Sequence, residues 1–241
     1  MPPRIDTIAE TGSTNADLIA RLAAGDPQPE GSWLVADRQR AGRGRQGRQW
    51  IDAPGNFMGS TVIRLAPSDP PAPSLSFVAA LAVYEAILAH LAQPVVLSLK
   101  WPNDVLLAGA KFCGILLERE GDWAVLGVGV NLAAAPALPD RETRSLAQSG
   151  PAPARDSFAL QLADSFEREL ARWRQFGLQP FLARWLAAAH PIGAALSVHD
   201  GLGVRVQGQF DGLEPDGALR LRLADGGLRV IHAGDVVVEG S

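Results

Sequence analysis

The chain has 241 residues, of which 47% are hydrophobic and 20% are charged. A folded chain of this length buries about 70 to 75% of the surface that its unfolded form exposes, so disordered and fibrous classes are excluded. Lys and Arg together number 22 and Asp and Glu 26, and the resulting net charge of −4 argues against a general nucleic-acid binder.

The sequence carries no signal for secretion or membrane insertion. The longest apolar run, residues 77–84, ends at Glu85, which is too short for a membrane span. Charged residues stand near the N-terminus, where a secretion signal would need an apolar stretch (Arg4, Asp6, Glu10). We therefore expect a soluble, cytoplasmic protein that does not bind membranes.

The basic residues are unevenly divided, because 20 are arginine and only Lys100 and Lys111 are lysine. An ammonium is a compact point charge and a guanidinium a planar fork, so the two lysines indicate a specific role, the alternative being chance retention. The single cysteine, Cys113, allows no intramolecular disulfide. The four histidines have no zinc-ligand spacing (His90, His190, His199, His232).

The larger part of the chain has the pattern of an α+β domain. Apolar periodicity predicts helices at 13–24, 75–91, 158–173 and 181–189. The 75–91 segment has the pattern of an amphipathic helix packed on a sheet. Strands are predicted at 33–36, 61–65, 95–99, 105–107, 115–117 and 123–130. The last four follow one another through short turns, so we expect an antiparallel meander with helices on one side.

After His190-Pro191 the apolar period changes to two, as in Val204, Val206 and Phe210 and again in 219–223. Turn sequences at 214–217 and 224–227 separate these strands. We therefore divide the chain into a catalytic domain, 1–190, and a small C-terminal β barrel, 191–241, docked on it.

The segment 42–48, Gly-Arg-Gly-Arg-Gln-Gly-Arg, is the strongest local motif. It fits the glycine pattern of dinucleotide-binding folds, but no helix pattern follows it, as that fold requires. It also has the glycine spacing of a P-loop, but Arg48 and Gln49 stand where a P-loop requires Lys and Ser or Thr. Five arginines fall within eleven residues, 38–48, and their repulsion predicts a loop that is mobile until an anion arrives. A solvated loop or an RNA-binding segment is the alternative, although only Trp50 is near to stack on a base.

A second group of polar residues follows the meander. The turn Lys100-Trp-Pro-Asn-Asp joins two strands, Lys111 opens the next, and Asn131 ends the fourth. A tight hairpin alone would explain Pro-Asn-Asp, but the meander brings Lys100, Asn103, Asp104, Lys111 and Asn131 to neighbouring strand ends. Gly127 and Gly129 share one face of the fourth strand, which predicts that something flat lies against that backbone.

This charge pattern suits a reaction between two anions. A carboxylate that attacks a phosphoryl group meets a repulsion of about 4 kcal/mol at roughly 4 Å, and lysines and arginines reduce it. Because no Gly-x-Ser-x-Gly elbow is present and Cys113 has no evident histidine partner, we expect catalysis by positioning and charge.

Taken together, these motifs resemble the ordered motifs of biotin protein ligases. They are Thr11-Gly-Ser-Thr-Asn, the 42–50 loop, Lys100-Trp-Pro-Asn-Asp, Lys111-Phe-Cys-Gly-Ile-Leu and Gly127-Val-Gly-Val-Asn. The resemblance covers nearly the whole chain and implies a mixed, largely antiparallel sheet flanked by helices, with an SH3-like C-terminal barrel.

The resemblance also implies roles for individual residues. Ser13, Thr14 and Gln39 would hydrogen-bond the ureido ring of biotin, and Trp50 would pack beside adenine. The implied biotin site comprises Ser13, Thr14, Asn15, Gln39, Gly42, Arg43, Gly44, Arg45, Lys111, Gly114, Gly127 and Gly129. The implied ATP site comprises Arg45, Arg48, Trp50, Lys100, Asn103 and Asn131. Arg45, Lys100 and Lys111 would be catalytic, and Asp104 would hold Mg²⁺ directly or through water.

The implied reaction forms biotinyl-5′-AMP from biotin and ATP and then transfers biotin to a lysine of a biotin carboxyl carrier protein. Gln46 stands where many members have arginine, so the adenylate is expected to be held less tightly. About ten residues precede the first motif, so no DNA-binding repressor domain is expected. A homodimer is compatible with the family. A lipoate-type ligase and a non-catalytic biotin- or RNA-binding module are the alternatives.

Overall fold

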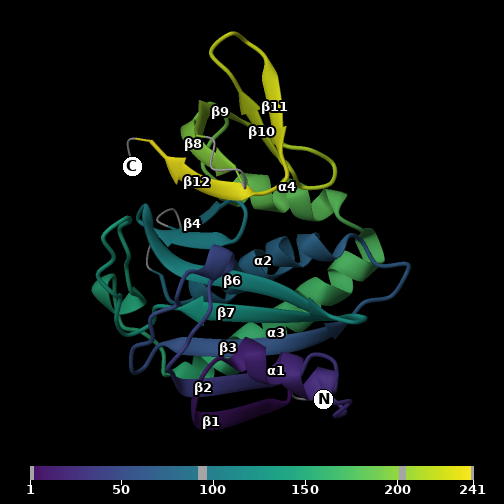
Figure 1. Ribbon diagram of the computed structural model, residues 1–241. Coiled ribbons are helices and arrows are strands. Elements are labelled where there is room, and N and C mark those ends of the chain that lie inside the picture. The colour runs from purple at the N-terminus through teal and green to yellow at the C-terminus, as the bar shows by residue number, and fades with distance from the viewer. Residues whose placement is uncertain (1–2, 92–96, 201–204, 240–241) are drawn as a thin grey trace.

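The computed structural model describes residues 3–91, 97–200 and 205–239. Within these residues a seven-stranded sheet carries helices on both faces, and a five-stranded sheet packs at one of its ends (Figure 1). Among the described helices, none is long and apolar enough to cross a membrane.

The larger sheet has the strand order β1-β2-β3-β7-β6-β5-β4. Its strands are β1 (Ile5–Thr11), β2 (Trp33–Gln39), β3 (Phe57–Arg64), β4 (Leu97–Lys100), β5 (Asp104–Leu107), β6 (Ala110–Glu120) and β7 (Trp123–Val130). The β1–β2 pair is parallel and the other pairs are antiparallel, so the mixed sheet and the meander from β4 to β7 are confirmed. The predicted strand residues 95 and 96 lie outside the described part of the chain.

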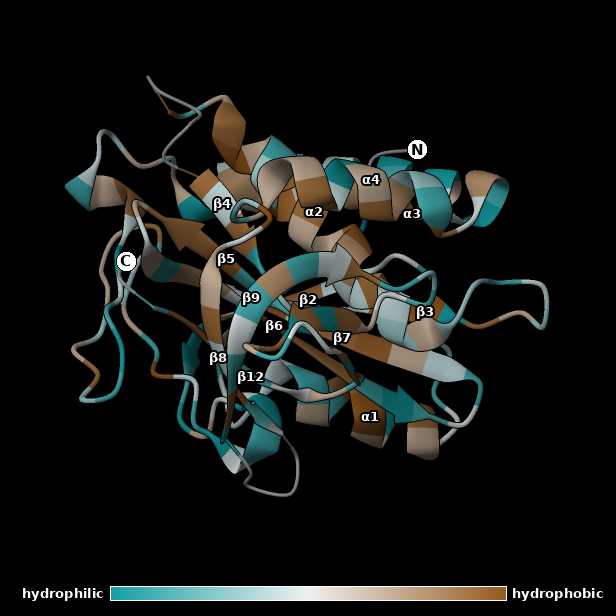
Figure 2. Ribbon diagram, turned by 90° about the horizontal axis from the view of Figure 1, so that it is seen from above, coloured by the Kyte–Doolittle hydropathy of each residue, from teal (hydrophilic) through white to brown (hydrophobic). Residues whose placement is uncertain are grey.

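The helices occupy two layers, one on each face of this sheet. They are α1 (Thr14–Ala23), α2 (Leu75–Leu88), α3 (Arg155–Phe176) and α4 (Gln179–Ala188), and single 3-10 turns lie at 45–47, 72–74 and 146–148. Figure 2 shows α2, α3 and α4 on one face and α1 on the other. The expectation that helices lie on one side only is therefore wrong: Leu18 of α1 packs with Leu34, Val62 and Val125 in a second, smaller core.

Helix α2 is buried rather than amphipathic. Ten of its 14 residues are buried, among them Phe77, Val78, Leu81 and Ile87. Strands lie on one side of α2, and α3 and α4 pack on another, so little of its surface meets water. By contrast, α3 has the single apolar stripe that the sequence predicts, and Phe158, Leu162, Phe166, Leu170 and Trp173 are all buried.

The C-terminal part forms the second sheet, with the order β11-β10-β9-β8-β12. Its antiparallel strands are β8 (Ala195–Asp200), β9 (Arg205–Leu213), β10 (Leu219–Arg222), β11 (Leu228–Ile231) and β12 (Gly234–Val238). Both predicted turns are present, since the Gly217 N–H donates to Glu214 and the Gly226 N–H to Leu223. Val204, predicted to lie in a strand here, falls outside the described residues.

The second sheet docks on the first through the turn before β10. The Trp101 indole Nε1 donates a hydrogen bond of 3.0 Å to the Gly217 carbonyl. Gly217 has a φ of +89°, and a Cβ atom there would lie 2.5 Å from the Phe77 ring, so glycine is needed for both backbone and space. Buried side chains of the two sheets belong to one continuous core, and the division at residue 190 stays a prediction.

Candidate functional site

A cavity of about 380 Å³ opens on the α1 side of the larger sheet. Its wall contains every residue predicted for the site except Gly42 and Lys100, namely Ser13, Thr14, Asn15, Gln39, Arg43, Gly44, Arg45, Arg48, Trp50, Asn103, Asp104, Lys111, Gly114, Gly127, Gly129 and Asn131. The 42–48 loop, the β4–β5 turn and the start of α1 thus meet around one space, as the motifs predict.

One end of the cavity is a buried polar network at the start of α1. Ser13 is the N-cap of α1, so the backbone turns here and Thr14 and Asn15 face the sheet. Gln39 Oε1 accepts the Thr14 N–H at 2.8 Å, and the hydroxyls of Thr14 and Ser60 lie 2.6 Å apart. All of these side chains are at most 8% exposed. Buried polar groups need partners, so this end favours a ligand with both donors and acceptors.

The glycines of the sheet make room for two side chains. A Cβ atom on Gly129 would fall 2.4 Å from Cε2 of Trp50, and one on Gly114 would fall 3.0 Å from Cζ3 of the same ring. A Cβ atom on Gly127 would fall 2.4 Å from Oδ1 of Asn15. The predicted flat partner of these strands is therefore the Trp50 indole, while Gly127 provides space for Asn15.

The centre of the cavity holds a carboxylate between the two lysines. Asp104 Oδ1 lies 2.7 Å from Lys111 Nζ, and Asp104 Oδ2 lies 3.3 Å from Lys100 Nζ. Burial alone would raise the pKa of Asp104, but the charges and hydrogen bonds of Lys111 and Lys100 outweigh it and bring the pKa to about 2. Asp104 therefore stays ionised at neutral pH, between the two lysine side chains.

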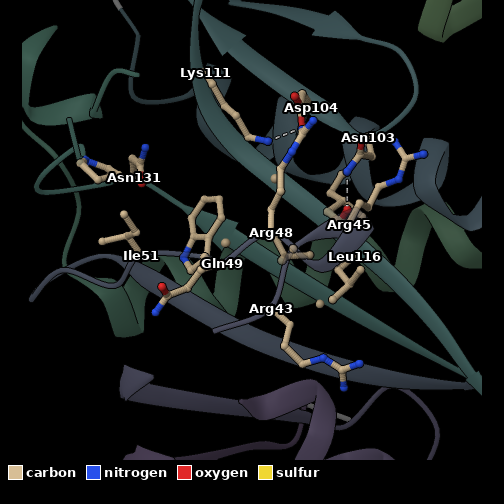
Figure 3. A pocket seen from close by; sticks show the side chains of 18 of the residues that line it. Arg43, Arg45, Arg48, Gln49, Ile51, Asn103, Asp104, Lys111, Leu116 and Asn131 are labelled. Carbon is tan, nitrogen blue, oxygen red and sulfur yellow. Dashed lines mark hydrogen bonds and ion pairs between the residues drawn. The ribbon is translucent and has the colours of Figure 1, made fainter. Parts of the chain in front are cut away.

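Lys111 and Lys100 occupy different positions in this cluster. Lys111 lines the cavity, and Figure 3 shows its amine directed at Asp104. Lys100 lies behind Asp104, where its Nζ donates 3.0 Å to the Val236 carbonyl of β12. Of the two, only Lys111 lines the cavity, whereas Lys100 contacts Asp104 and β12.

Each arginine of the 38–48 loop contacts a polar or acidic partner. Arg45 donates to Asn103 Oδ1 at 2.9 Å in the cavity wall (Figure 3). Burial lowers the pKa of Arg45, whereas the charges of Asp104 and Asp235 raise it. The other four pairs are Arg38–Asp52, Arg40–Glu10, Arg43–Glu118 and Arg48–Asp235. These partners offset part of the repulsion between the arginines, and the mobility of the loop before an anion arrives stays a prediction.

Gly42 lies outside the cavity wall, at the point where the two ends of the 42–50 loop come together. The Trp50 N–H donates 2.9 Å to the Gly42 carbonyl, and a Cβ atom on Gly42 would fall 2.5 Å from the Trp50 carbonyl oxygen. Only glycine permits this close approach of two backbones. Gly42 therefore shapes the loop, and its assignment to the biotin site stays a prediction.

The site includes residues that the sequence did not reveal. Ser60 and Glu118 lie behind the polar end, where they contact Thr14 and Asn15. Asp140, Arg141 and Thr143 line the cavity from the segment before α3, and Asp235 lines it from β12. Burial raises the pKa of Asp235, but the Arg48 hydrogen bond and charge outweigh it and leave the pKa below its usual range. None of these residues stands in a motif, and their approach depends on long-range packing.

The fit of a metal ion to the cavity depends on the side chains that could hold it. In the described ranges, no three His, Cys, Asp or Glu side chains are grouped to hold a metal ion. Both oxygens of Asp104 already pair with lysines, so this carboxylate does not fit a direct metal ligand in this arrangement. Cys113 is fully buried beneath the cluster, and burial raises the pKa of its thiol, so it is no nucleophile.

Comparison with known proteins agrees with this geometry. Residues 13–131 match the Biotin/lipoate A/B protein ligase family, and residues 202–238 match the Biotin protein ligase C terminal domain. The fold is similar to that of the biotin protein ligase from Aquifex aeolicus in complex with biotin and ATP, with a TM-score of 0.85 and 24% identity over 98% of this chain and 99% of that chain.

Two curated relatives are named Biotin--[acetyl-CoA-carboxylase] ligase. The Paracoccus denitrificans protein is 38% identical, and the match covers 97% of this chain and 100% of that protein. The Mycobacterium tuberculosis protein is also 38% identical, with 97% and 88% covered. At this identity and coverage, the chain belongs to the biotin protein ligase family.

Proposed function

We propose that this protein activates biotin with ATP and transfers it to a lysine of a biotin carboxyl carrier protein. In the first step a carboxylate oxygen of biotin attacks the α-phosphorus of ATP, the bond to the β-phosphate breaks, and pyrophosphate leaves. In the second step the carrier amine attacks the acyl carbon of biotinyl-5′-AMP, an amide forms with loss of a proton, and AMP leaves.

The observation that carries this proposal is the order of groups along one cavity. Thr14, Gln39 and Ser60 form its polar end, and Lys111, with Asp104, lies beside Arg45 and Asn103 at the charged end. A molecule with a cyclic urea at one end and a carboxylate at the other matches this order. An apolar acyl group such as lipoate would leave the buried polar groups unpaired, at a cost of about 1 to 3 kcal/mol each.

The cations provide the catalytic contribution. Two unit charges at roughly 4 Å repel by about 4 kcal/mol at an effective dielectric of 20, so a carboxylate approaches a phosphate slowly unless cations lie between them. We assign Lys111 and Arg45 to this role, with Arg48, Asn103 and Asn131 on the phosphate side. Lys100 holds Asp104 and, through it, Lys111. Because these charges are fixed in advance, little reorganisation accompanies the reaction.

Trp50 and the 42–48 loop account for adenine binding and for the protection of the intermediate from water. The indole already lies over Gly114 and Gly129, and we propose that adenine packs beside it. Arg43 and Gly44 on the same loop would then cover the adenylate and exclude water from the mixed anhydride.

Magnesium enters this proposal only with the nucleotide. The residues of the site do not form a cage for it, so we propose that it is held by the phosphate oxygens of ATP, with Asp104 contacting it through water. We also propose a cytoplasmic location, where ATP and the carrier are available, and no membrane or DNA partner. A homodimer stays a prediction; β1 forms an edge of the larger sheet where a second copy could pair.

Pyrophosphate release tests the proposal. The protein is mixed with MgATP and either biotin or lipoate, and release is followed with and without a biotin carboxyl carrier domain. Release with biotin, and a mass increase of the carrier by one biotinyl group, are expected. Release with lipoate alone would identify a lipoate-type ligase, and no release with either would indicate a binding module.

A further inference from the structure

Glu118 connects the polar end of the cavity to the arginine loop. Its side chain extends from β6, and only 20% of it is exposed. Oε2 accepts a hydrogen bond of 2.9 Å from Asn15 Nδ2, and Oε1 lies 2.7 Å from an Arg43 guanidinium nitrogen. One carboxylate therefore contacts two predicted biotin-site residues, and neither step of the proposed reaction requires it to touch substrate.

The contact with Asn15 determines which way the Asn15 amide faces. A carboxylate only accepts, so the atom facing Glu118 must be Nδ2. The second contact of Nδ2, to the Leu116 carbonyl, is 3.4 Å long and therefore weaker. Asn15 Oδ1 then faces Ser60, whose hydroxyl donates to it at 2.5 Å.

This orientation propagates to Thr14. The Ser60 hydroxyl has a single hydrogen, which Asn15 accepts, so Ser60 Oγ is left to accept the Thr14 hydroxyl hydrogen at 2.6 Å. Gln39 Oε1 is a second acceptor for this hydrogen, at the longer distance of 3.1 Å. Thr14 Oγ1 then presents only lone pairs to the cavity. Gln39 Oε1 accepts the Thr14 N–H, and its Nε2 donors have no partner among the described residues.

The resulting pattern matches a cyclic urea, whose ring N–H needs an acceptor and whose carbonyl needs a donor. If the Asn15 amide were reversed, Ser60 would accept from it and donate its own hydrogen to Thr14 Oγ1, and the Thr14 hydrogen would turn to Gln39 Oε1. A ring N–H of the ligand would then compete with Ser60 for the lone pairs of Thr14 Oγ1.

The contact with Arg43 adds a link to the loop. Arg43 is half exposed, and Glu118 is the acidic partner that holds its guanidinium on the β6 side of the cavity. Loss of this ion pair would free one side of the loop near the polar end.

We propose that Glu118 is a positioning residue that sets the donor and acceptor pattern of the ureido end through Asn15, Ser60 and Thr14, and that holds Arg43 over the same end. This inference rests on the proposed function, because it assigns the polar end to the ureido ring.

The test combines two variants of Glu118 with one of Thr14. Biotin affinity is measured by isothermal titration calorimetry on the full chain, alone and in the Thr14→Val background. Glu118→Met removes the carboxylate at similar volume and is expected to weaken biotin binding about tenfold, the equivalent of one hydrogen bond. In the Thr14→Val background the same change is expected to cost less than about twofold, because the hydroxyl on which Glu118 acts is gone.

Glu118→Gln separates the two contacts. Its carbonyl can still accept from Asn15, so biotin affinity is expected to stay within about threefold of the parent. Its lost charge frees Arg43, so biotinyl-5′-AMP is expected to escape more than about threefold faster. Glu120→Met is the matched control: it removes a charge from the same strand and face, and among the described residues Asn15 and Arg43 contact Glu118 and not Glu120.

The outcomes are distinct. Equal penalties for Glu118→Met with and without the Thr14 hydroxyl would overturn the positioning role, as would biotin binding that matches the Glu120→Met control. If Glu118→Met does not fold, Glu118→Ala replaces it in the cycle, and Glu118→Gln tests the loop contact independently. A parent protein that neither binds biotin nor releases pyrophosphate would refute the proposed function itself.

Discussion

The indole of Trp50 covers Gly129 so closely that a Cβ atom on Gly129 would fall 2.4 Å from the ring. Gly129→Ala must therefore push the ring off the sheet. We expect ATP affinity to fall about tenfold or more, because the displaced ring no longer lies beside the adenine position. Titration with ATP measures this. In a Trp50→Ala background the Gly129→Ala change should have no further effect, and an equal loss there would contradict the packing argument.

Lys111→Met removes the cation that lines the cavity. We expect the rate of pyrophosphate release to fall about 10²-fold or more, with weak biotin binding retained, because the loss affects charge that develops during the reaction. Lys111→Arg should not restore the rate, since a planar fork does not replace a compact ammonium. Lys100→Ala should lower the rate by a similar factor through Asp104. An unchanged rate would remove the altered lysine from the mechanism.

Arg45→Gly removes the guanidinium that contacts Asn103 in the cavity wall. The adenylate should then leak from the protein more quickly, because one of the cations that hold it is missing. Trapping of released biotinyl-5′-AMP in a single-turnover reaction gives the escape rate. Arg40→Gly is the control on the same loop, since Arg40 pairs with Glu10 outside the cavity. Equal escape rates for the two variants would show that Arg45 does not retain the intermediate.

Gln46→Arg adds a cation at an exposed loop position. Gln46 has a φ of 55° and a ψ of 35°, in the left-handed region that neither glutamine nor arginine favours. The substitution therefore leaves the backbone strain nearly unchanged and alters mainly the charge. Escape of the adenylate should slow by about two- to threefold at low salt, and the gain should disappear near 0.5 M salt because exposed charges are screened. If escape stays slower at high salt, the new arginine would be making a direct contact with the adenylate and not a long-range charge interaction.

His190 predicts a pH dependence of stability. Burial and the charge of Lys100 lower the pKa of His190 from 6.5 to about 4, and its ring packs 4.5 Å from that of Phe210. The unfolded imidazole takes up a proton below pH 6.5, whereas the folded one does not until about pH 4. The free energy of unfolding should therefore fall by about 3 kcal/mol as the pH is lowered through this window. Thermal unfolding at pH 7 and pH 5 measures the effect, and His190→Gln should lose less stability between these values than the parent.

The elements that were predictable from sequence are those whose partners are close along the chain. The β4–β7 meander is an example, because short turns determine its pairing and therefore bring Lys100, Asp104 and Lys111 together. The spacing of Gly127 and Gly129 likewise predicted a bare strip of backbone. The alternation of side chains along a strand is enough to predict this strip, but it does not predict that Trp50 covers it.

The elements that were missed depend on distant partners. β1 is an edge strand with a largely exposed pattern, and it pairs in parallel with β2 only after the α1 crossover. Ser60, Glu118 and Asp235 enter the site from three separate strands, and each is an ordinary polar residue in its own segment. The acidic partners of the loop arginines were missed for the same reason, so the repulsion between these arginines was taken without the charges that offset it.

The burial of Cys113 has a practical consequence. The described chain offers no other thiol, and this one is fully enclosed with a raised pKa, so it should resist maleimide reagents. A cysteine placed at the exposed position 46 would then accept a fluorophore selectively, without prior removal of the native residue. Such a labelled protein would report the movement of the arginine loop in real time as each substrate is added.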